Sequence, residues 1–229
     1  MRTIAILPIK SFGAAKQRLR GALTDSSREI LAEAMFADVL ATLRNAPGIR
    51  EVVVVTGNRL AGDAARSGGV SVLHDGEESG QSAAAGLGIR HALTTGHDRV
   101  LLVPGDTPLL GSDELTGMLG RAEADATAVT IVPDRHREGT NALLLSPPTA
   151  IDPSFGPGSL ARHVAAARAA GVSHRVEELP GLMLDLDTPE DLATLSATLD
   201  ELDGGAPRTR AALARLGDLP AEPLPGVRN

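Results

Sequence analysis

Val-Val-Val-Val-Thr, at residues 52–56, is the stretch of this sequence that decides the fold class. Four consecutive β-branched residues leave no polar face, so the strand that they form must be covered on both sides, as strands of parallel sheets are. On either side of this stretch, short β-branched runs alternate with longer stretches of helical period. The alternation predicts an α/β fold, a single three-layer domain with a mostly parallel, mixed sheet.

The expected elements follow from this periodicity. We expect strands over residues 3–9, 52–56, 70–73, 100–103, 128–132, 142–145, 173–177 and 182–186. We expect helices over residues 24–45, 59–67, 82–93, 112–122, 159–170 and 189–199. From residue 203 the chain is rich in Gly, Pro and Arg, which predicts a domain over residues 1–202 and a mobile tail over residues 203–229, with room for a short helix over 209–216.

The composition excludes several classes of protein. The 229 residues are 42% hydrophobic, enough to fill a core, and the net charge of −7 argues against binding to nucleic acid. Only three aromatic residues occur, all Phe, so a platform for stacking several bases is excluded, and the absence of Cys excludes disulfides and thiolate metal sites. No stretch resembles a membrane span or a signal peptide, which predicts a cytoplasmic protein without membrane contact.

The first candidate site is a basic loop after the first expected strand. Only two of the 22 basic residues are Lys, and both lie in this loop. Four cations fall within its eleven residues, namely Lys10, Lys16, Arg18 and Arg20. Ligands of open parallel sheets bind beyond the carboxyl ends of the strands, and cations placed there neutralise phosphate oxygens. The loop is therefore either a polyphosphate cradle or a solvated basic loop that covers the sheet.

The second candidate site is a set of carboxylates that also follow expected strands. Asp106 comes directly after an apolar strand, and Gly105 lets a ligand approach closely, although Asp at this place is also a common turn or capping residue. Asp185 and Asp187 lie two apart in an expected strand, so both carboxylates would project to the same side. Capping of the final helix by Thr188 or Asp187 would explain Asp187 but not Asp185. Together the three carboxylates would hold Mg²⁺ and leave positions for phosphates and water.

A third candidate site combines two loops rich in Gly and hydroxyl groups. Thr140 offers a hydroxyl at the start of a strand, and Phe-Gly-Pro-Gly-Ser at residues 155–159 precedes a helix that Ser159 is expected to cap. A helix N-terminus with free amides binds anions, and the alternative is an ordinary loop and cap. His163, one turn further on, is expected at the surface, and the spacing of the six His residues does not fit a zinc site.

The order of these motifs resembles one enzyme family. LPIKSFGAAKQRLR, VPGDTPLL, EGTNALLL, FGPGS and LDLDTPEDL are similar to segments of the 2-phospho-L-lactate / phosphoenolpyruvate guanylyltransferase family, over about residues 2–200. The resemblance implies a single Rossmann-like nucleotidyltransferase domain that transfers GMP from GTP to the phosphate of a three-carbon acid and releases pyrophosphate, in the biosynthesis of coenzyme F(420). The strong bias towards Arg and Ala resembles that of high-GC bacteria, for which the family resemblance implies phosphoenolpyruvate rather than 2-phospho-L-lactate. A downstream transferase would take over the product.

The resemblance also implies roles for residues. It implies that Asp106, Asp185 and Asp187 hold Mg²⁺, that Lys10, Lys16, Arg18, Arg20 and Ser82 bind GTP, and that Thr140, Gly156 and Ser159 bind the acid. Lys10, Lys16 and Asp106 would be the catalytic residues. Gly-Gln-Ser-Ala at residues 80–83 departs from the family pattern where the nucleoside is expected. The alternatives are another Mg²⁺-dependent nucleotidyltransferase, with a molybdopterin or sugar-phosphate acceptor, and a nucleotide-binding regulator without catalytic activity.

Overall fold

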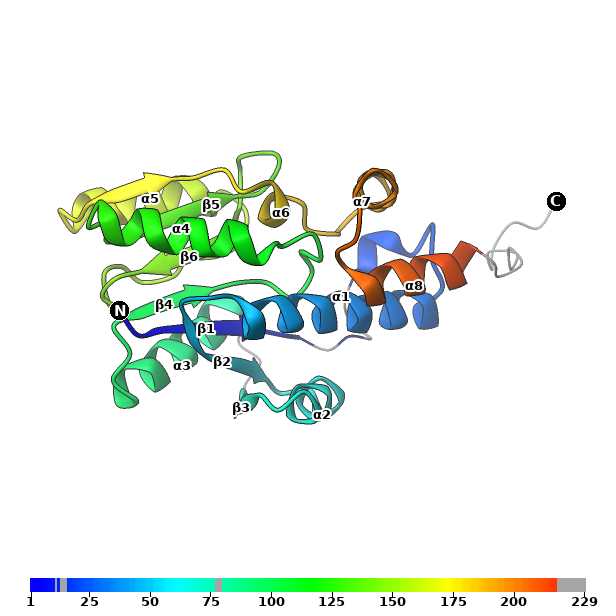
Figure 1. The fold of residues 1–229 in the computed structure, drawn as a ribbon, viewed down its shortest axis with the longest axis horizontal. Coiled ribbons are helices and arrows are strands. Elements are labelled where there is room, and N and C mark those ends of the chain that lie inside the picture. The colour runs from blue at the N-terminus through cyan, green and yellow to red at the C-terminus, as the bar shows by residue number, and fades with distance from the viewer. Residues whose placement is uncertain (11, 13–15, 77–79, 218–229) are drawn as a thin grey trace.

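The sheet has the mixed, mostly parallel character expected from the sequence. The computed structural model describes residues 1–10, 12, 16–76 and 80–217. Within them, seven strands form one sheet in the order β3-β2-β1-β4-β6-β5-β7 (Figure 1). The strands are β1 (Thr3–Pro8), β2 (Ile49–Thr56), β3 (Ser71–His74), β4 (Arg99–Leu102), β5 (Val129–Pro133), β6 (Thr140–Leu145) and β7 (His174–Val176). Only β6 is antiparallel to its neighbours in this described sheet.

Helices cover both faces of the sheet and give three layers. One face packs against α1 (Asp25–Asn45), α2 (Arg59–Ser67) and α4 (Ser112–Ala124), and the other against α3 (Gln81–Thr94) and α5 (Ser159–Ala169). The other helical segments described are η1 (Gln17–Leu19), α6 (Pro180–Met183), α7 (Pro189–Glu201) and α8 (Pro207–Gly217). Among the described residues, no helix is both long and apolar enough to cross a bilayer.

The central strands are buried on both faces, as the Val-rich stretch predicts. Leu7 and Leu101 belong to the core under α1, whereas Ile6 and Leu102 belong to the core under α3. All four side chains are at most 1% exposed. Successive side chains of a strand point to opposite faces, so apolar residues must occupy every position of a strand covered on both sides. The three-layer α/β prediction is therefore confirmed.

The antiparallel direction of β6 decides where the candidate residues meet. The parallel strands β1 and β4 end at one edge of the sheet, where the loops containing Lys10 and Asp106 begin. Because β6 runs in the opposite direction beside β4, its first residues, Thr140 and Asn141, lie at this same edge. The polar residues that follow β1 and β4 and those that open β6 therefore meet at one end of the sheet.

One expected strand is wrong. Residues 182–186 were expected to be extended, but Pro180–Met183 is a short helix, α6, and the residues after it are irregular. The carbonyl groups of Leu182 and Met183 accept hydrogen bonds from the side-chain amide of Asn141, at 2.8 and 3.2 Å. The Asn141 side chain thus satisfies backbone carbonyl groups that a neighbouring strand would otherwise bond. The apolar residues of 182–186 can therefore be buried although this segment does not pair with the sheet.

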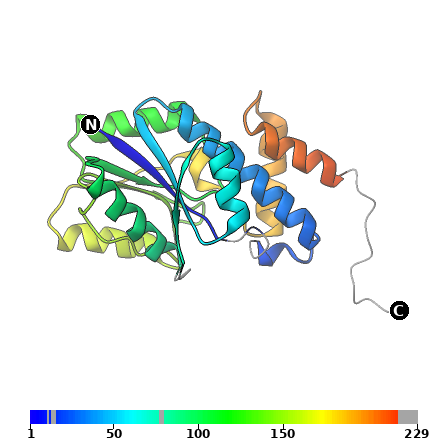
Figure 2. The same cartoon turned by 90° about the horizontal axis from the view of Figure 1, so that it is seen from below.

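The C-terminal helix α8 packs on α1 beyond the carboxyl end of β1 (Figures 1 and 2). Its attachment is specific, because the buried carboxylate of Asp38 in α1 accepts hydrogen bonds from the backbone amides of Arg208 and Thr209, at 3.2 and 2.7 Å, and from the Thr209 hydroxyl at 2.8 Å. A helix therefore does form near residues 209–216. The domain boundary at residue 203 stays a prediction, and residues 218–229 of the expected tail lie outside the described residues.

Candidate active site

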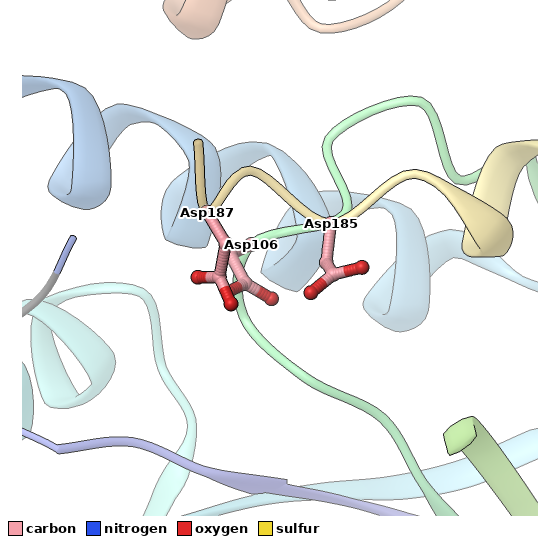
Figure 3. A group of neighbouring side chains, drawn as sticks. All are labelled: Asp106, Asp185 and Asp187. Atoms are coloured by element: carbon pink, nitrogen blue, oxygen red, sulfur yellow. The ribbon is translucent and has the colours of Figure 1, made fainter. Parts of the chain in front are cut away.

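Three carboxyl groups converge at the carboxyl end of β4. Asp106 lies in the loop after β4, and Asp185 and Asp187 lie in the segment between α6 and α7 (Figure 3). Each offers an oxygen atom that lies within 4.8 Å of those of the other two. The expected strand geometry for Asp185 and Asp187 is absent, yet the irregular segment still brings both carboxylates beside Asp106. The three residues chosen from the sequence are thus brought together.

Local contacts hold these two segments against each other. The backbone amide of Leu186 donates to the carbonyl oxygen of Asp106 at 3.3 Å, and Asn141 Nδ2 donates to Asp185 Oδ1 at 3.0 Å. A Cβ atom at Gly105 would lie 2.3 Å from Ile9 Cδ1, so the side chain of Ile9 packs directly against this glycine and would have to move for a larger residue. The loop after β4 and the segment over residues 184–187 are therefore tied together by the backbone and by β6.

Thr188, rather than Asp187, caps α7. The Thr188 hydroxyl accepts from the Asp191 amide at 3.2 Å, and Asp191 Oδ2 accepts from the amides of Asp187 and Thr188 at 3.0 and 2.7 Å. Arg135 pairs with Asp191 at 2.8 Å. Burial raises the pKa of Asp191, but the hydrogen bonds that it accepts and the charge of Arg135 outweigh burial and hold this pKa below its usual value. The cap therefore positions the backbone of Asp187 and leaves its carboxylate free for the cluster.

Lys16 inserts its ammonium group between two of the carboxylates. Lys16 Nζ donates to Asp106 Oδ2 and, at 3.1 Å, to Asp187 Oδ1, and its side chain is 7% exposed. Burial alone would lower the pKa of Lys16, but the two carboxylates raise it above its usual value, so the ammonium stays charged. Its backbone is left-handed, with φ 60°, and the fully buried Leu19 anchors the adjacent turn η1. The geometry places one of the two Lys residues in the acidic cluster.

The electrostatics of the cluster fit a divalent cation. Burial, and then the charge of Asp106, raise the pKa of Asp185 to about 6, because ionised carboxylates repel one another in a poorly solvated site. Within the described part of the chain, the buried Asp106 Oδ1 has no hydrogen-bond partner. Buried polar atoms are normally paired, and carboxylate oxygens are the ligands that Mg²⁺ prefers. The donor set and this unpaired oxygen therefore fit a bound Mg²⁺ ion.

A cleft of about 290 Å³ opens beside the cluster. Its polar lining includes Lys10, Lys16, Asp75, Gln81 and Asp106, and its apolar lining includes Ile9, Phe12, Ala32, Phe36 and Ala84. The side chains of Arg18 and Arg20 are exposed and do not belong to this lining, and Ser82 does not either. Two of the expected GTP-binding residues, Lys10 and Lys16, therefore border the cleft. The GTP-binding roles of Arg18, Arg20 and Ser82 stay predictions.

The loop before α5 is held by hydrogen bonds from Arg162 and to Ser82. The Arg162 guanidinium donates to the carbonyl groups of Ser154 and Phe155, at 2.9 and 3.1 Å, and to that of Pro157. Ser82 Oγ accepts from the Phe155 amide at 2.9 Å. In the part of the chain that the structure describes, the amides of Gly156 and Gly158 have no hydrogen-bond partner. Amides free on one side of a loop whose carbonyls point to the other side can bind an anion.

The helix that follows begins differently from the expectation. Gly158, with φ 70°, is the N-cap residue of α5 and Ser159 is its first residue, so the expected capping role of Ser159 is wrong. Ser159 is 1% exposed, and Gly156 is left-handed with φ 105°, a conformation that a residue with a side chain rarely adopts. Gly156, Ser159 and Thr140 lie on segments that pack together through His163, and their binding roles stay predictions.

Sequence reasoning did not give the roles of two residues that organise the site. The sequence marks Gly139-Thr140-Asn141 as a candidate that offers a hydroxyl and an amide at the mouth of a strand, but the contacts of Asn141 with Asp185 and α6 depend on long-range packing. His163 was expected at the surface but is 0% exposed, because Thr140 and Ser154 bond both of its ring nitrogens. A lone His on a helix gives no sequence signal of such burial. For Asn141 the sequence does offer one signal. It directly follows Thr140 in a strand, and because successive side chains point to opposite faces of a sheet, the two residues are expected to contact different parts of the site.

The fold is similar to that of several solved structures. A putative nucleotide-diphospho-sugar transferase from Desulfovibrio desulfuricans G20 superposes with a TM-score of 0.75 at 16% identity, covering 94% of this chain and 95% of that one. 4-Diphosphocytidyl-2C-methyl-D-erythritol synthase superposes with a TM-score of 0.61 at 16% identity, covering 87% and 99% of the two chains. At 16% identity these two likenesses show the fold alone, and it is one found in the class of nucleotidyltransferases.

The sequence comparisons define the family within this class. The model of the guanylyl transferase CofC-like family matches residues 3–203, and the chain belongs to this family. It is 45% identical to a phosphoenolpyruvate guanylyltransferase of Conexibacter woesei over 216 residues, which are 94% of this chain and 97% of that protein. It is 41% identical to the protein of the same name from Rubrobacter xylanophilus over 198 residues, which are 86% and 95% of the two chains. The resemblance inferred from the motifs is confirmed.

Proposed function

We propose that this enzyme transfers GMP from GTP to the phosphate of phosphoenolpyruvate and releases pyrophosphate. The observation that carries the proposal is the convergence of Asp106, Asp185 and Asp187 beside a cleft that Lys10 and Lys16 border. The names of the relatives from Conexibacter woesei and Rubrobacter xylanophilus support the guanylyl donor and the acid. 2-Phospho-L-lactate is the alternative acid, and the product is proposed to serve the biosynthesis of coenzyme F(420).

The lining of the cleft supports GTP as the occupant. Phe12 and Phe36 pack together, with ring centroids 5.6 Å apart, and are at most 5% exposed, so they form part of an apolar wall beside which the base would lie. Lys10 and Lys16 supply the cations that a triphosphate requires. Both substrates are anions and the protein has a net charge of −7. The attraction of these two lysines for the substrates must therefore exceed the repulsion from the negative charge of the whole protein.

Mg²⁺ is the proposed cofactor, held by the three carboxylates. When bound, it would compensate charge on the phosphates of GTP. The chain provides the rest of this arrangement. Asn141 holds the carboxylate of Asp185, and the Thr188 cap positions the backbone of Asp187. Lys16 stays charged, so it would stabilise the negative charge that develops on the departing pyrophosphate.

The loop before α5 is the proposed site of the acid. Its phosphate and carboxylate oxygens only accept hydrogen bonds, so every direct contact requires a donor. The Thr140 hydroxyl and the amides of Gly156 and Gly158 offer such donors. The amides of Ser159 and Leu160 already donate to the carbonyl groups of Gly156 and Glu138, so Ser159 would contribute its hydroxyl. Asn141 follows Thr140 in β6 and contacts Asp185, so the acid would lie beside the carboxylate cluster.

The reaction that these residues support is an in-line displacement at phosphorus. An oxygen of the acid's phosphate forms a bond to the α-phosphorus of GTP, and the bond from that phosphorus to the bridging oxygen of the β-phosphate breaks. Pyrophosphate leaves with the electron pair of this bond. Such a transfer depends on positioning and charge and requires no protein nucleophile.

The test is pyrophosphate release with GTP and Mg²⁺ and one acid at a time. Phosphoenolpyruvate, 2-phospho-L-lactate and 3-phospho-D-glycerate form the panel, with the downstream transferase and its deazaflavin acceptor present as a trap. We expect release with phosphoenolpyruvate that requires GTP and stops on chelation of Mg²⁺. Both substrates occur in the cytoplasm, where we propose that the reaction takes place. Release only with a molybdopterin or sugar-phosphate acceptor, or GTP binding without release, would contradict the proposal.

A further inference from the structure

A fully buried histidine connects the two segments proposed to hold the acid. His163 lies one turn into α5, and its ring is enclosed between the start of β6 and the loop at Ser154. Its Nδ1 atom lies 2.9 Å from Thr140 Oγ1, and its Nε2 atom lies 2.9 Å from the backbone nitrogen of Ser154. The edge of the ring also meets Phe155, with centroids 5.4 Å apart and ring planes at 74°.

These contacts determine where the ring carries its proton. The backbone amide of Ser154 can only donate, so Nε2 must accept and carries no proton. The neutral ring then carries its proton on Nδ1, which donates to Thr140 Oγ1. Burial, and then the charge of Arg162, lower the pKa of His163 to about 4, which agrees with a neutral ring.

The direction of the hydroxyl of Thr140 follows from this tautomer. Because Thr140 Oγ1 accepts from His163, its own hydrogen cannot point at the ring. Among the described residues no other hydrogen-bond partner of this hydroxyl is present. Thr140 is 7% exposed, so this hydrogen is left for an acceptor that reaches the exposed part of the residue, and the oxygens of a phosphorylated acid are such acceptors.

We propose that His163 is a positioning residue for the acid, because it directs the Thr140 hydroxyl outward as a donor and holds the 154–159 loop at the matching place. The inference rests on the proposed function. It assigns to His163 a role that acts through Thr140, without contact with either substrate. A hydrogen bond to a charged group is worth about a tenfold to hundredfold change in affinity.

Two substitutions separate the two bonds of the ring. The amide of Gln in His163→Gln reaches the position of Nε2, where its oxygen accepts from Ser154, but no donor to Thr140 remains. The amide of Asn in His163→Asn reaches the position of Nδ1 and donates to Thr140, but the acceptor for Ser154 is lost. We expect His163→Gln to raise the KM for phosphoenolpyruvate about tenfold or more, with the KM for GTP unchanged, and His163→Asn to raise it by a smaller factor.

Two controls distinguish positioning from a structural role. His97 is also buried and pairs through Nδ1 with a threonine, Thr95, at 2.9 Å, at the other end of the sheet. His97→Gln should therefore lower the melting temperature without changing the KM for the acid. In a Thr140→Val background, His163→Gln should have no further effect on this KM, because the hydroxyl through which it acts is absent.

The outcomes separate this inference from the proposed function. A wild-type enzyme without guanylyl transfer to any acid overturns both. An active wild type in which His163→Gln leaves the KM for the acid unchanged, or multiplies it equally in the Thr140→Val background, overturns the role of His163 alone. The ¹⁵N spectrum of the imidazole is a second readout, expected to show a proton on Nδ1, and a proton on Nε2 would also overturn the inference.

Discussion

Two consecutive residues of β6 connect to two regions of the molecule, the acidic cluster and the loop before α5. The two regions differ in how far their polar groups are paired within the protein. Asn141 reaches the cluster, where the pKa of Asp185 is raised to about 6 and a buried oxygen of Asp106 lacks a partner among the described residues. Thr140 contacts His163, which together with Ser82 and Arg162 bonds the backbone of the loop. The comparison indicates that the cluster is arranged for a charge brought by a ligand, whereas the loop is arranged to keep its shape.

The largest effect is expected in the cluster. Asp106→Asn or Asp185→Asn should reduce guanylyl transfer about a thousandfold or more, because each removes a carboxylate proposed to hold Mg²⁺. Asp185→Asn should not lower the melting temperature, since it relieves repulsion with Asp106 and Asp187. Asp106→Asn should lower it, because it also weakens the pair with the buried ammonium of Lys16. Turnover and thermal unfolding measure the two effects, and Asp200→Asn, at an exposed position of α7, is the matched control. Activity within tenfold of the parent would exclude this metal site.

The second largest effect is expected from the substitution of Lys16. Lys16→Ala removes the cation between Asp106 and Asp187 and should raise the apparent KM for GTP about tenfold or more, because the triphosphate loses its buried counter-charge. Lys10 is exposed, so Lys10→Ala should have a smaller effect. Steady-state kinetics with GTP varied at saturating acid measure both changes. An unchanged KM for GTP in Lys16→Ala would show that this lysine only neutralises the cluster.

A substitution of Ser82 distinguishes a role in the loop before α5 from a role in binding GTP. Ser82→Ala removes the acceptor for the Phe155 amide and should raise the KM for the acid a few-fold, with the KM for GTP unchanged. Kinetics with each substrate varied in turn give the two values. The opposite pattern, a higher KM for GTP alone, would favour the GTP-binding role that the family resemblance implies for Ser82.

The loop should also make stability depend on pH. The native pKa of His163 is about 4, below the usual value of 6.5, so between these values the unfolded chain takes up a proton that the native protein excludes. Stability should therefore fall as the pH is lowered from 6.5 to 4. Urea unfolding at several pH values should show a weaker fall for His163→Asn than for the parent. Equal slopes would indicate that the pKa of His163 is the same in the native and the unfolded protein.

The smallest effect on activity is expected far from both regions. Asp38→Ala removes the acceptor of two amides and one hydroxyl at the start of α8 and should lower the free energy of unfolding by about 2 kcal/mol. Turnover at low temperature should stay at the parent value. The control is Asp63→Ala, which removes an exposed pair with Arg66 and should change stability by less than about 0.5 kcal/mol. A turnover loss in Asp38→Ala would connect α8 to catalysis.

The fold was predictable because burial on both faces leaves a direct trace in the sequence. The all-apolar run that opens residues 52–56 is typical of a strand covered by helices on both sides, and residues that follow parallel strands meet at one edge whatever the loop details. Residues 182–186 carry the same apolar pattern as a strand, however, and only the distant amide of Asn141 shows why they do not form one. The burial of His163 and the docking of α8 likewise depend on contacts between residues far apart in the chain.

The packing beneath the Lys16 turn has a consequence for synthesis of the protein. Leu19 belongs to a small apolar cluster with Leu31, Leu186, Leu195 and Ala212, which come from opposite ends of the described chain. A chain that emerges from the ribosome N-terminus first can pair β1 with β2 early, but it cannot complete this cluster until residue 212 has been made. The lysine that enters the acidic cluster therefore gains its support last, so nascent chains should acquire the sheet before they acquire the active site.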